Sequence, residues 1–436
     1  MGIRRKGAAL LMALLLASCH LTGCSVEEFL AEVPETMQVK PYGSEEQTAE
    51  ENSGKVAEQE KKEDSGTDSA DFSSDSNDHT QAQAESVSFL SEDAFCFAYE
   101  SLSTEEKLWY QDIEQALGSM TEKARLSEEG LTAGLNESSI DKIFQCVLID
   151  HPEIFYVDGY SYTKYSRGEK TVAIDFSGNY QLTPPEVTFR KTEIEQAAEK
   201  FLASLPLPAS DYDKVKYVFE TIIRNTEYDL NAPDNQNIYS VFVGGASVCQ
   251  GYAKATQYLL NRLGVDCTLV QGKVENGEGH AWNLVRVDGS FYYVDTTWGD
   301  ASYQREDGQD AQMQFLPEIN YDYLCVTTGQ LLRTHTLENI VPLPECVDTA
   351  ANYYVRQGAL FEHYDREQMK RLFEESAAGG SRDVTIKCAD MECYNQIKKA
   401  LIEEQEIFDY LPDGEASVSY AHNEKQLSLT FWVTNE

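Results

Sequence analysis

Apolar side chains recur with helical and strand periodicity in the stretch that begins near residue 88. Residues 103–106 have the composition of a helix start, and a second helical pattern covers residues 140–150. Residues 155–162 and 171–176 are rich in aromatic and β-branched side chains, which is typical of strands. Residues 88–185 are therefore predicted to form a small α/β domain.

The dipeptide Pro184-Pro185 separates this region from the next. Beyond it, residues 194–205 and 211–224 place apolar side chains at helical spacing and are predicted to be amphipathic helices. Residues 249–263 show the same periodicity, and the glycine that follows them is a frequent helix terminator. The central part of the chain is therefore expected to begin with three helices.

A β-hairpin is predicted directly downstream. A strand over residues 279–287 is followed by Asp288-Gly289, a strong signal for a two-residue turn, and residues 290–296 form the return strand. With such a turn Trp282 faces Asp295, and His280 lies diagonal to Asp295 on the same face, at a Cβ separation of roughly 7 Å. An imidazole and a carboxylate can meet across that distance.

The last part of the chain again mixes helices and strands. It contains predicted helices at residues 365–375 and 391–404 and predicted strands at residues 384–388, 416–421 and 426–433. We therefore expect a central domain at residues 186–345 and a C-terminal α/β domain at residues 346–436. No role is assigned to His335, His363 or His422, since a lone histidine is more often structural than functional.

The first residues indicate export. Three basic residues precede an apolar run, residues 8–17, which has the length of a signal-peptide core and is too short to span a bilayer. The segment Leu21-Thr22-Gly23-Cys24 resembles a bacterial lipobox. We expect residues 1–23 to be removed as a lipoprotein signal peptide, and a lipid on Cys24 to anchor the exported, extracytoplasmic protein to the cell membrane. An ordinary cleaved signal with an incidental cysteine is the alternative.

The charge and composition of the chain exclude one class of partner and predict a disordered segment. The net charge is −39 at pH 7, and acidity of this size repels phosphate backbones, so no nucleic-acid partner is expected. Residues 24–87 are acidic, polar and poor in aromatic residues. Such a segment buries too little apolar surface to offset its ordering entropy, and we expect a disordered linker.

Cys249 is the first residue of the third predicted helix, with Ser247 as its expected N-cap. Free backbone N–H groups at a helix start stabilise a thiolate and can receive an oxyanion. A carboxylate on one nitrogen of His280 fixes its tautomer and leaves the other nitrogen to take the thiol proton. Cys249, His280 and Asp295 are therefore the candidate triad, although local geometry does not bring Cys249 to His280. Taken alone, Cys249 would be read as a buried structural cysteine.

Three sequence blocks carry a family resemblance: VCQGYA at residues 248–253, GHAWN at 279–283 and YVDTTW at 293–298. In order and spacing they resemble the motifs of the transglutaminase-like superfamily over about residues 211–300. The resemblance implies an α+β fold with a papain-like core, the nucleophile helix packed on an antiparallel sheet. It also implies Cys249 as nucleophile, His280 as general base and acid, and Asp295 as the orienting residue. The chain differs at Gly299, where many relatives have an acidic residue, and Asp300 follows.

Some residues near the motifs have two interpretations. Gln250 either contacts an oxyanion or is an exposed residue of the first helical turn. Trp282 and Trp298 either line an acyl-substrate groove or pack beside the hairpin, which is the commoner fate of large aromatics. Cys267 lies in a strand-like run and is expected to be buried and inert.

The spacing of the cysteines matches no metal-binding or cofactor-binding motif. There are 10 cysteines, none at zinc-site spacing, so neither a metal nor a cofactor is expected. One or two disulfides among Cys325, Cys346, Cys388 and Cys393 would be compatible with export.

The function that these features favour is acyl transfer from an amide or peptide bond through a thioester at Cys249. Hydrolysis is favoured over crosslinking because it needs only water as acceptor. A protein, peptide or cell-wall peptide is the expected substrate. The alternative is a non-catalytic surface-binding lipoprotein that uses the same fold for recognition.

Overall fold

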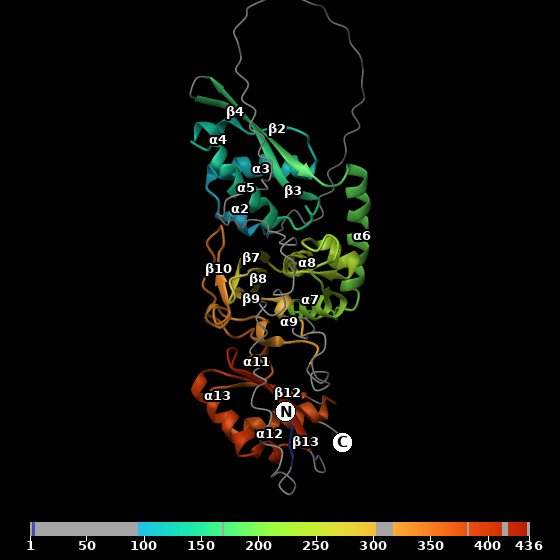
Figure 1. Ribbon diagram of the computed structural model, residues 1–436, viewed down its shortest axis with the longest axis vertical. Helices are drawn as coiled ribbons and strands as arrows, with labels where there is room; N and C mark the ends of the chain where they lie inside the picture. The colour runs from blue at the N-terminus through green and yellow to red at the C-terminus, as the bar shows by residue number, and fades with distance from the viewer. Residues whose placement is uncertain are drawn as a thin grey trace, which may run out of the picture. The chain divides into compact units, whose positions relative to one another are not determined.

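The computed structural model describes residues 2–4, 95–167, 170–301, 317–381, 383–411 and 417–433 (Figure 1). The predicted linker at residues 24–87 and most of the predicted signal peptide lie outside these ranges. Internal contacts divide the chain into two compact units. One comprises residues 1–42, 197–339 and 343–436, and the other residues 43–196 and 340–342. The division into domains at residues 88–185, 186–345 and 346–436 stays a prediction.

The smaller unit packs helices against a three-stranded sheet of order β2-β4-β3. Its elements are α2 (Phe97–Ser101), α3 (Thr104–Gly118), β2 (Ala124–Arg125), α4 (Glu128–Thr132), α5 (Glu137–Asp150), β3 (Val157–Arg167) and β4 (Lys170–Tyr180). The predicted helix start is confirmed, since Ser103 and Glu106 form a reciprocal capping box at the beginning of α3. This region is thus mixed α and β, as the periodicity indicates.

The prediction of a break at Pro184-Pro185 followed by a helix from residue 194 is wrong in its bounds, because α6 runs over Pro184–Leu202. Proline fits the first turn of a helix, where its missing N–H has no intrahelical acceptor. The Glu186 carboxylate accepts hydrogen bonds from the backbone and side chain of Thr183, at 2.8 and 2.6 Å. Next in the chain, α7 (Asp211–Asn225) matches the prediction and buries its apolar stripe.

The central region is built on a four-stranded antiparallel sheet of order β10-β7-β8-β9. Its strands are β7 (Cys267–Val274), β8 (Gly279–Val287), β9 (Ser290–Val294) and β10 (His335–Leu337). The helix α8 (Cys249–Arg262) packs on β7 and β8, and α7 packs on α8. Upstream lie β5 (Glu227–Tyr228), the π-helix η2 (Ser240–Gly244) and β6 (Ala246–Ser247). A helix on an antiparallel sheet is the expected arrangement.

The hairpin register is confirmed. Val287 pairs with Ser290, and both turn residues have positive φ, 50° at Asp288 and 89° at Gly289, which suits a tight two-residue turn. The return strand is shorter than predicted, because it ends at Val294. Asp295 instead caps the short helix α9 (Thr296–Gly299), accepting the Trp298 backbone N–H. The change of direction after β9 therefore places the carboxylate at the end of the strand.

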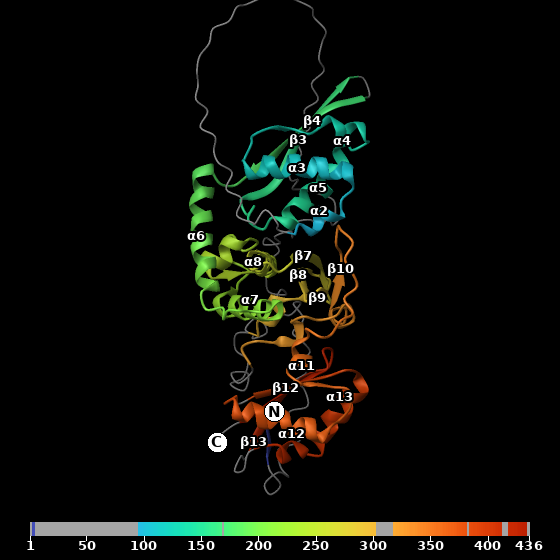
Figure 2. The same ribbon diagram turned by 180° about the vertical axis from the view of Figure 1, so that it is seen from behind.

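The C-terminal region forms a mixed sheet of order β1-β13-β14-β12-β11. Its elements are α11 (Tyr353–Arg356), β11 (Leu360–Phe361), α12 (Arg366–Ala378), β12 (Asp383–Cys388), α13 (Met391–Lys398), η5 (Lys399–Glu403), η6 (Glu406–Asp409), β13 (Ser417–Asn423) and β14 (Ser428–Val433). The strand β1 (Gly2–Arg4) pairs with β13 at the edge. Both α12 and α13 pack against β12, as the two views in Figures 1 and 2 show. The predicted helices and strands are all present, with ends shifted by a few residues.

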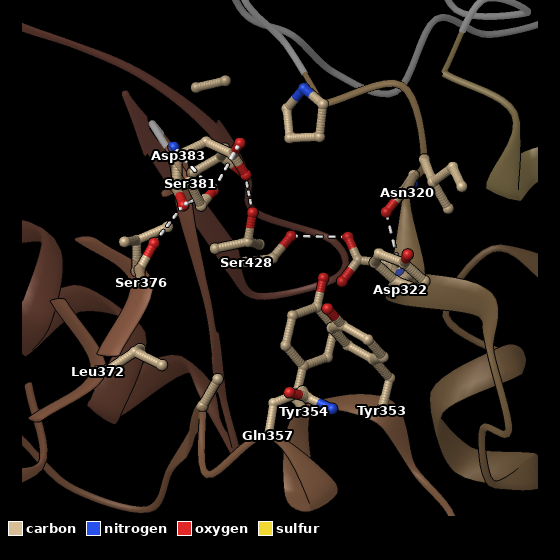
Figure 3. A pocket seen from close by; sticks show the side chains of 18 of the residues that line it. Asn320, Asp322, Tyr353, Tyr354, Gln357, Leu372, Ser376, Ser381, Asp383 and Ser428 are labelled. Atoms are coloured by element: carbon tan, nitrogen blue, oxygen red, sulfur yellow. Dashed lines mark hydrogen bonds between the residues drawn. The ribbon is translucent and has the colours of Figure 1, made fainter. Parts of the chain in front are cut away.

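A buried ion pair joins this sheet to the central region. Lys387 of β12 donates to Asp322 in η4 (Tyr321–Tyr323) at 2.8 Å, and Ser428 donates to the other carboxylate oxygen at 2.7 Å. Burial lowers the pKa of Lys387, and the charge of Asp322 opposes that shift. A cavity of about 410 Å³ lies beside the pair, with Tyr353 and Ser428 among its lining residues (Figure 3). No residue of the candidate triad lines this cavity.

Replacing Asp322 by Ala is expected to destabilise the protein by about 3–5 kcal/mol, because the Lys387 ammonium would remain buried without its counterion. The melting temperature in differential scanning calorimetry measures this. The double variant Asp322→Leu/Lys387→Met, which removes both charges, should recover much of the loss. A single variant that melts like the parent protein would contradict the assignment of the pair as a structural link.

The one or two disulfides that export would allow among Cys325, Cys346, Cys388 and Cys393 are not formed, since all four are free thiols in the structure. Cysteine spacing alone could not have chosen a pairing among them. Within the part of the chain that the structure describes, none of the helices combines the length and apolarity that crossing a membrane requires.

Candidate active site

Cys249 is the first residue of α8, as predicted, and is only partly buried. The expected N-cap is wrong, because Val248 occupies that position and makes no side-chain cap. The Ser247 hydroxyl is instead hydrogen-bonded to the Asn235 carbonyl oxygen and to the Ser240 hydroxyl, with an oxygen–oxygen distance of 2.7 Å in both cases. The first N–H groups of α8 are thus without intrahelical acceptors at the end where the thiol lies. They can receive a developing negative charge there.

The glycine two residues after Cys249 has a steric reason. A Cβ on Gly251 would lie 1.9 Å from the Ser247 hydroxyl oxygen and 3.0 Å from the Asn235 carbonyl oxygen. Only glycine lets the first turn of α8 approach this loop so closely. The loop in turn fixes the chain that enters the helix at Cys249.

His280 and Asp295 meet as the hairpin register predicts. His280 Nε2 lies 2.8 Å from Asp295 Oδ2, and both side chains are buried. Cys249 adjoins the same imidazole and helps to raise the pKa of His280, and because Nε2 faces Asp295, Nδ1 is the nitrogen left for sulfur. The structure therefore brings the three predicted residues together, in the order thiol, imidazole, carboxylate.

The positive charge of His280 and the negative charge of Asp295 stabilise each other. Burial alone would lower the pKa of His280, but the charge and hydrogen bond of Asp295, with the adjoining Cys249, raise it to about 10. The pKa of Asp295 shifts in the opposite direction. Burial would raise its pKa, while the His280 charge and the hydrogen bonds from His280 and His335 hold it well below the ordinary value. At neutral pH the imidazole is therefore protonated beside an ionised carboxylate.

His335 is the residue that sequence reasoning missed. Its Nε2 lies 3.0 Å from Asp295 Oδ2, the oxygen that His280 also contacts, and its side chain is buried. It begins β10, whose pairing with β7 brings it beside the triad. No local signal could have revealed this, since Asp295 is 40 residues away in the chain.

His280, Asp295 and His335 are also close enough to hold a metal ion, since their candidate ligand atoms lie within 4.8 Å of one another. In this arrangement both Nε2 atoms are directed at Asp295 Oδ2. Hydrogen bonds thus use the atoms that a metal would need.

The rings of Trp282 and Trp298 lie beside the imidazoles of His280 and His335. Trp282 is fully buried with its ring centroid 5.8 Å from that of His280, which fits packing. Trp298 is half-buried, and its ring centroid lies 6.0 Å from His280 and 4.7 Å from His335. Gln250 is buried, so its interpretation as an exposed first-turn residue is wrong. Contact of Gln250 or Trp298 with substrate stays a prediction. Cys267 is buried, as expected, and burial raises the pKa of its thiol.

Packing against α7 explains why residue 299 is a glycine, where many relatives have an acidic residue. A Cβ there would lie 2.1 Å from the Phe219 ring and 3.0 Å from Ile223, both on α7. The next residue supplies the carboxylate, since Asp300 is buried and accepts a hydrogen bond from Tyr252 at 3.0 Å. An acidic side chain at residue 299 would therefore require α7 to move.

Fold and site together define an α+β protein in which a cysteine begins a helix packed on an antiparallel sheet, and a histidine and an aspartate meet at that sheet. Residues 201–296 match the sequence model of the transglutaminase-like superfamily, so the chain carries a transglutaminase-like domain.

Two curated relatives match part of the chain. Kyphoscoliosis peptidase of Mus musculus is 28% identical over 106 residues, and that of Homo sapiens is 27% identical over 106 residues. Each match covers 21% of this chain and 16% of the relative, so the chain spans only a small part of those proteins. A solved structure described as that of a TGase shares 13% identity, at a TM-score of 0.25, over 42% of this chain and 63% of the other.

Proposed function

We propose that this protein is an exported lipoprotein that cleaves amide or peptide bonds through a thioester on Cys249. The observation that carries the proposal is the His280 imidazole, which is hydrogen-bonded to Asp295 at 2.8 Å and adjoins the Cys249 side chain. A transglutaminase-like domain with this arrangement supports an enzyme. The name peptidase given to the two relatives agrees with cleavage, although each is matched over only 16% of its length.

The proposed reaction has two halves. The Cys249 thiolate attacks the carbonyl carbon of the amide, and the N–H groups at the start of α8 stabilise the oxyanion. His280 gives its proton to the amide nitrogen as the C–N bond breaks, which leaves an acyl thioester and a free amine. Water then attacks the thioester, His280 takes the proton of the water, and the C–S bond breaks to release a carboxylic acid. Asp295 keeps the imidazole oriented throughout.

Hydrolysis and crosslinking differ only in the acceptor of the acyl group. We propose hydrolysis of a protein, peptide or cell-wall peptide, because water needs no dedicated acceptor site. Incubating the full chain with a peptide library and an excess of a primary amine should yield mainly carboxylic acids, by mass spectrometry. Cys249→Ala should form no product, whereas the matched variant Cys267→Ser should retain activity.

Two other outcomes of that experiment would replace the proposal. Products that carry the amine in place of the acid would show crosslinking as the activity. Binding of peptides without any Cys249-dependent product would favour the surface-binding module instead.

The anchoring part of the proposal rests on the sequence Leu21-Thr22-Gly23-Cys24 and the basic, apolar segment before it. We expect the mature protein to begin at a lipid-modified Cys24, so cleavage would also remove β1 from the edge of the C-terminal sheet. Intact-mass analysis of membrane-extracted protein tests this. An unmodified N-terminus elsewhere, or membrane retention of Cys24→Ala, would contradict it.

A further inference from the structure

A buried chain of hydrogen bonds continues beyond Asp295, on the side away from Cys249. His335 Nδ1 lies 2.9 Å from the Thr334 hydroxyl oxygen. That oxygen lies 3.3 Å from Gln426 Nε2, and Gln426 Oε1 lies 3.3 Å from Lys387 Nζ. His335, Thr334, Gln426 and Lys387 are all buried. The chain thus runs from the triad carboxylate to a cation on β12 of the C-terminal sheet.

The direction of each hydrogen bond follows from the Lys387 end. An ammonium group only donates, so the carbonyl oxygen of Gln426 faces Lys387 and the amide NH₂ group faces Thr334. The Gln426 NH₂ group therefore donates to the Thr334 oxygen. The Thr334 proton is free to donate to His335 Nδ1 at 2.9 Å, a better distance than the 3.5 Å to the Leu331 carbonyl.

The contact with Asp295 determines which ring nitrogen of His335 carries the proton. A carboxylate only accepts, so the Nε2 atom of His335 that lies 3.0 Å from Asp295 Oδ2 must carry the ring proton. Burial lowers the pKa of His335, which agrees with a neutral ring that holds a single proton. The Asp295 end thus selects the tautomer with the proton on Nε2, and the Thr334 hydroxyl can then donate to the acceptor at Nδ1.

We propose that His335 is a positioning residue of the active site, held in its Nε2–H tautomer by Thr334 and Gln426, so that the C-terminal region orients Asp295. Gln426 lies between β13 and β14, and its NH₂ group also donates to Tyr323 at 3.1 Å. The C-terminal sheet is then part of the catalytic machinery rather than an appended domain. The inference rests on the proposed function, because it assigns a support to the same triad.

The physical reason lies in the geometry of Asp295. Its Oδ1 accepts from the Trp298 backbone at 3.0 Å, and its Oδ2 accepts from two imidazoles at 2.8 and 3.0 Å. Without His335, rotation of the carboxylate is opposed only by Trp298 and by His280 itself. His280 would then be oriented less well toward Cys249, and the thiolate would lose part of its stabilisation.

The test measures the rate at which iodoacetamide alkylates Cys249 in the full chain, as a function of pH, by peptide mapping. His335→Phe should slow alkylation at neutral pH by roughly 10- to 100-fold, the loss seen when comparable hydrogen-bond partners that orient metal-binding side chains are removed. It should also move the rise of the rate toward higher pH. His335→Gln, which keeps an N–H donor, should recover most of the rate.

Thr334 provides a milder pair of variants. Thr334→Val keeps the shape but removes the hydroxyl, so it should shift the pH profile in the same direction as His335→Phe. Thr334→Ser should restore the parent profile. This pair decides the question even where His335→Phe does not fold, which a melting curve shows. His363→Phe is the matched control, since His363 is exposed and lies outside the chain of hydrogen bonds.

The outcomes separate this inference from the proposed function. A parent protein whose Cys249 is no more reactive than Cys267 would overturn the proposed function itself. A reactive Cys249 whose pH profile is the same in folded Thr334→Val and Thr334→Ser would overturn the role of this chain alone. Gln426→Met should act in the same direction as Thr334→Val, and an unchanged profile would remove the C-terminal region from the mechanism.

Discussion

The variant Asp295→Asn should lose most of its activity and should lose it first at alkaline pH. Asp295 raises the pKa of His280 to about 10 against the effect of burial. An amide has no charge, so burial would then lower the pKa of His280, and the imidazolium would give up its proton at a lower pH. Because the proton of His280 is needed for the leaving amine, the alkaline limb of the rate profile should move down, past the ordinary histidine value of about 6.5.

The loss should be large because an amide cannot meet the hydrogen bonds that Asp295 accepts. Three N–H groups point at this carboxylate, from His280, His335 and Trp298. An asparagine has one oxygen, so its NH₂ group would face at least one of these donors. A carboxylate-to-amide change in another catalytic triad lowers kcat by about 10⁴-fold, and we expect a loss on the order of 10²- to 10⁴-fold.

The measurement is kcat/KM against pH for both proteins, with circular dichroism to show that the variant is folded. Asp266→Asn is a matched control, because Asp266 is a partly exposed carboxylate that accepts a hydrogen bond from Arg286 at 3.3 Å and is not a member of the triad. An alkaline limb that stays in place in Asp295→Asn would mean that Asp295 does not set the protonation of His280.

The part of the site that sequence could predict is the part held together by local geometry. A two-residue turn at Asp288-Gly289 allows one register, and that register alone puts His280 and Asp295 on one face. The position of Cys249 at a helix start follows from the periodicity of the segment after it. The approach of α8 to β8 is a tertiary contact, which only the family resemblance indicated.

The residues that sequence reasoning missed act through contacts distant in the chain. His335 reaches Asp295 because β10 pairs with β7, and Gln426 reaches Thr334 across 92 residues. Neither residue belongs to a motif, and no role was assigned to His335 from the sequence. An exposed position in the first helical turn was one of the two interpretations of Gln250, yet α8 is buried along most of its length. Pattern reasoning assumes one solvent face, which a central helix does not have.

Cys249 is expected to be the most reactive of the cysteines that the structure describes. Its partners are a protonated imidazole and the free N–H groups of a helix start, and both favour a thiolate. Cys267, Cys325 and Cys388 are buried, and burial raises the pKa of each of these thiols. Removing His280 takes away both the positive charge and the proton acceptor of Cys249. The His280→Ala protein should therefore keep its fold and lose this selectivity.

The central claim is that Cys249 and His280 form a working pair, and competitive alkylation tests it most directly. The folded full chain is treated with limiting iodoacetamide at pH 6.5, well below the ordinary thiol pKa of about 8.5, and labelled cysteines are quantified by peptide mapping. Cys249 should be labelled far ahead of Cys267 in the parent protein, and His280→Ala should slow the labelling of Cys249 by at least roughly 10²-fold. Equal labelling of Cys249 and Cys267 in the folded parent, unaffected by His280→Ala, would contradict this claim.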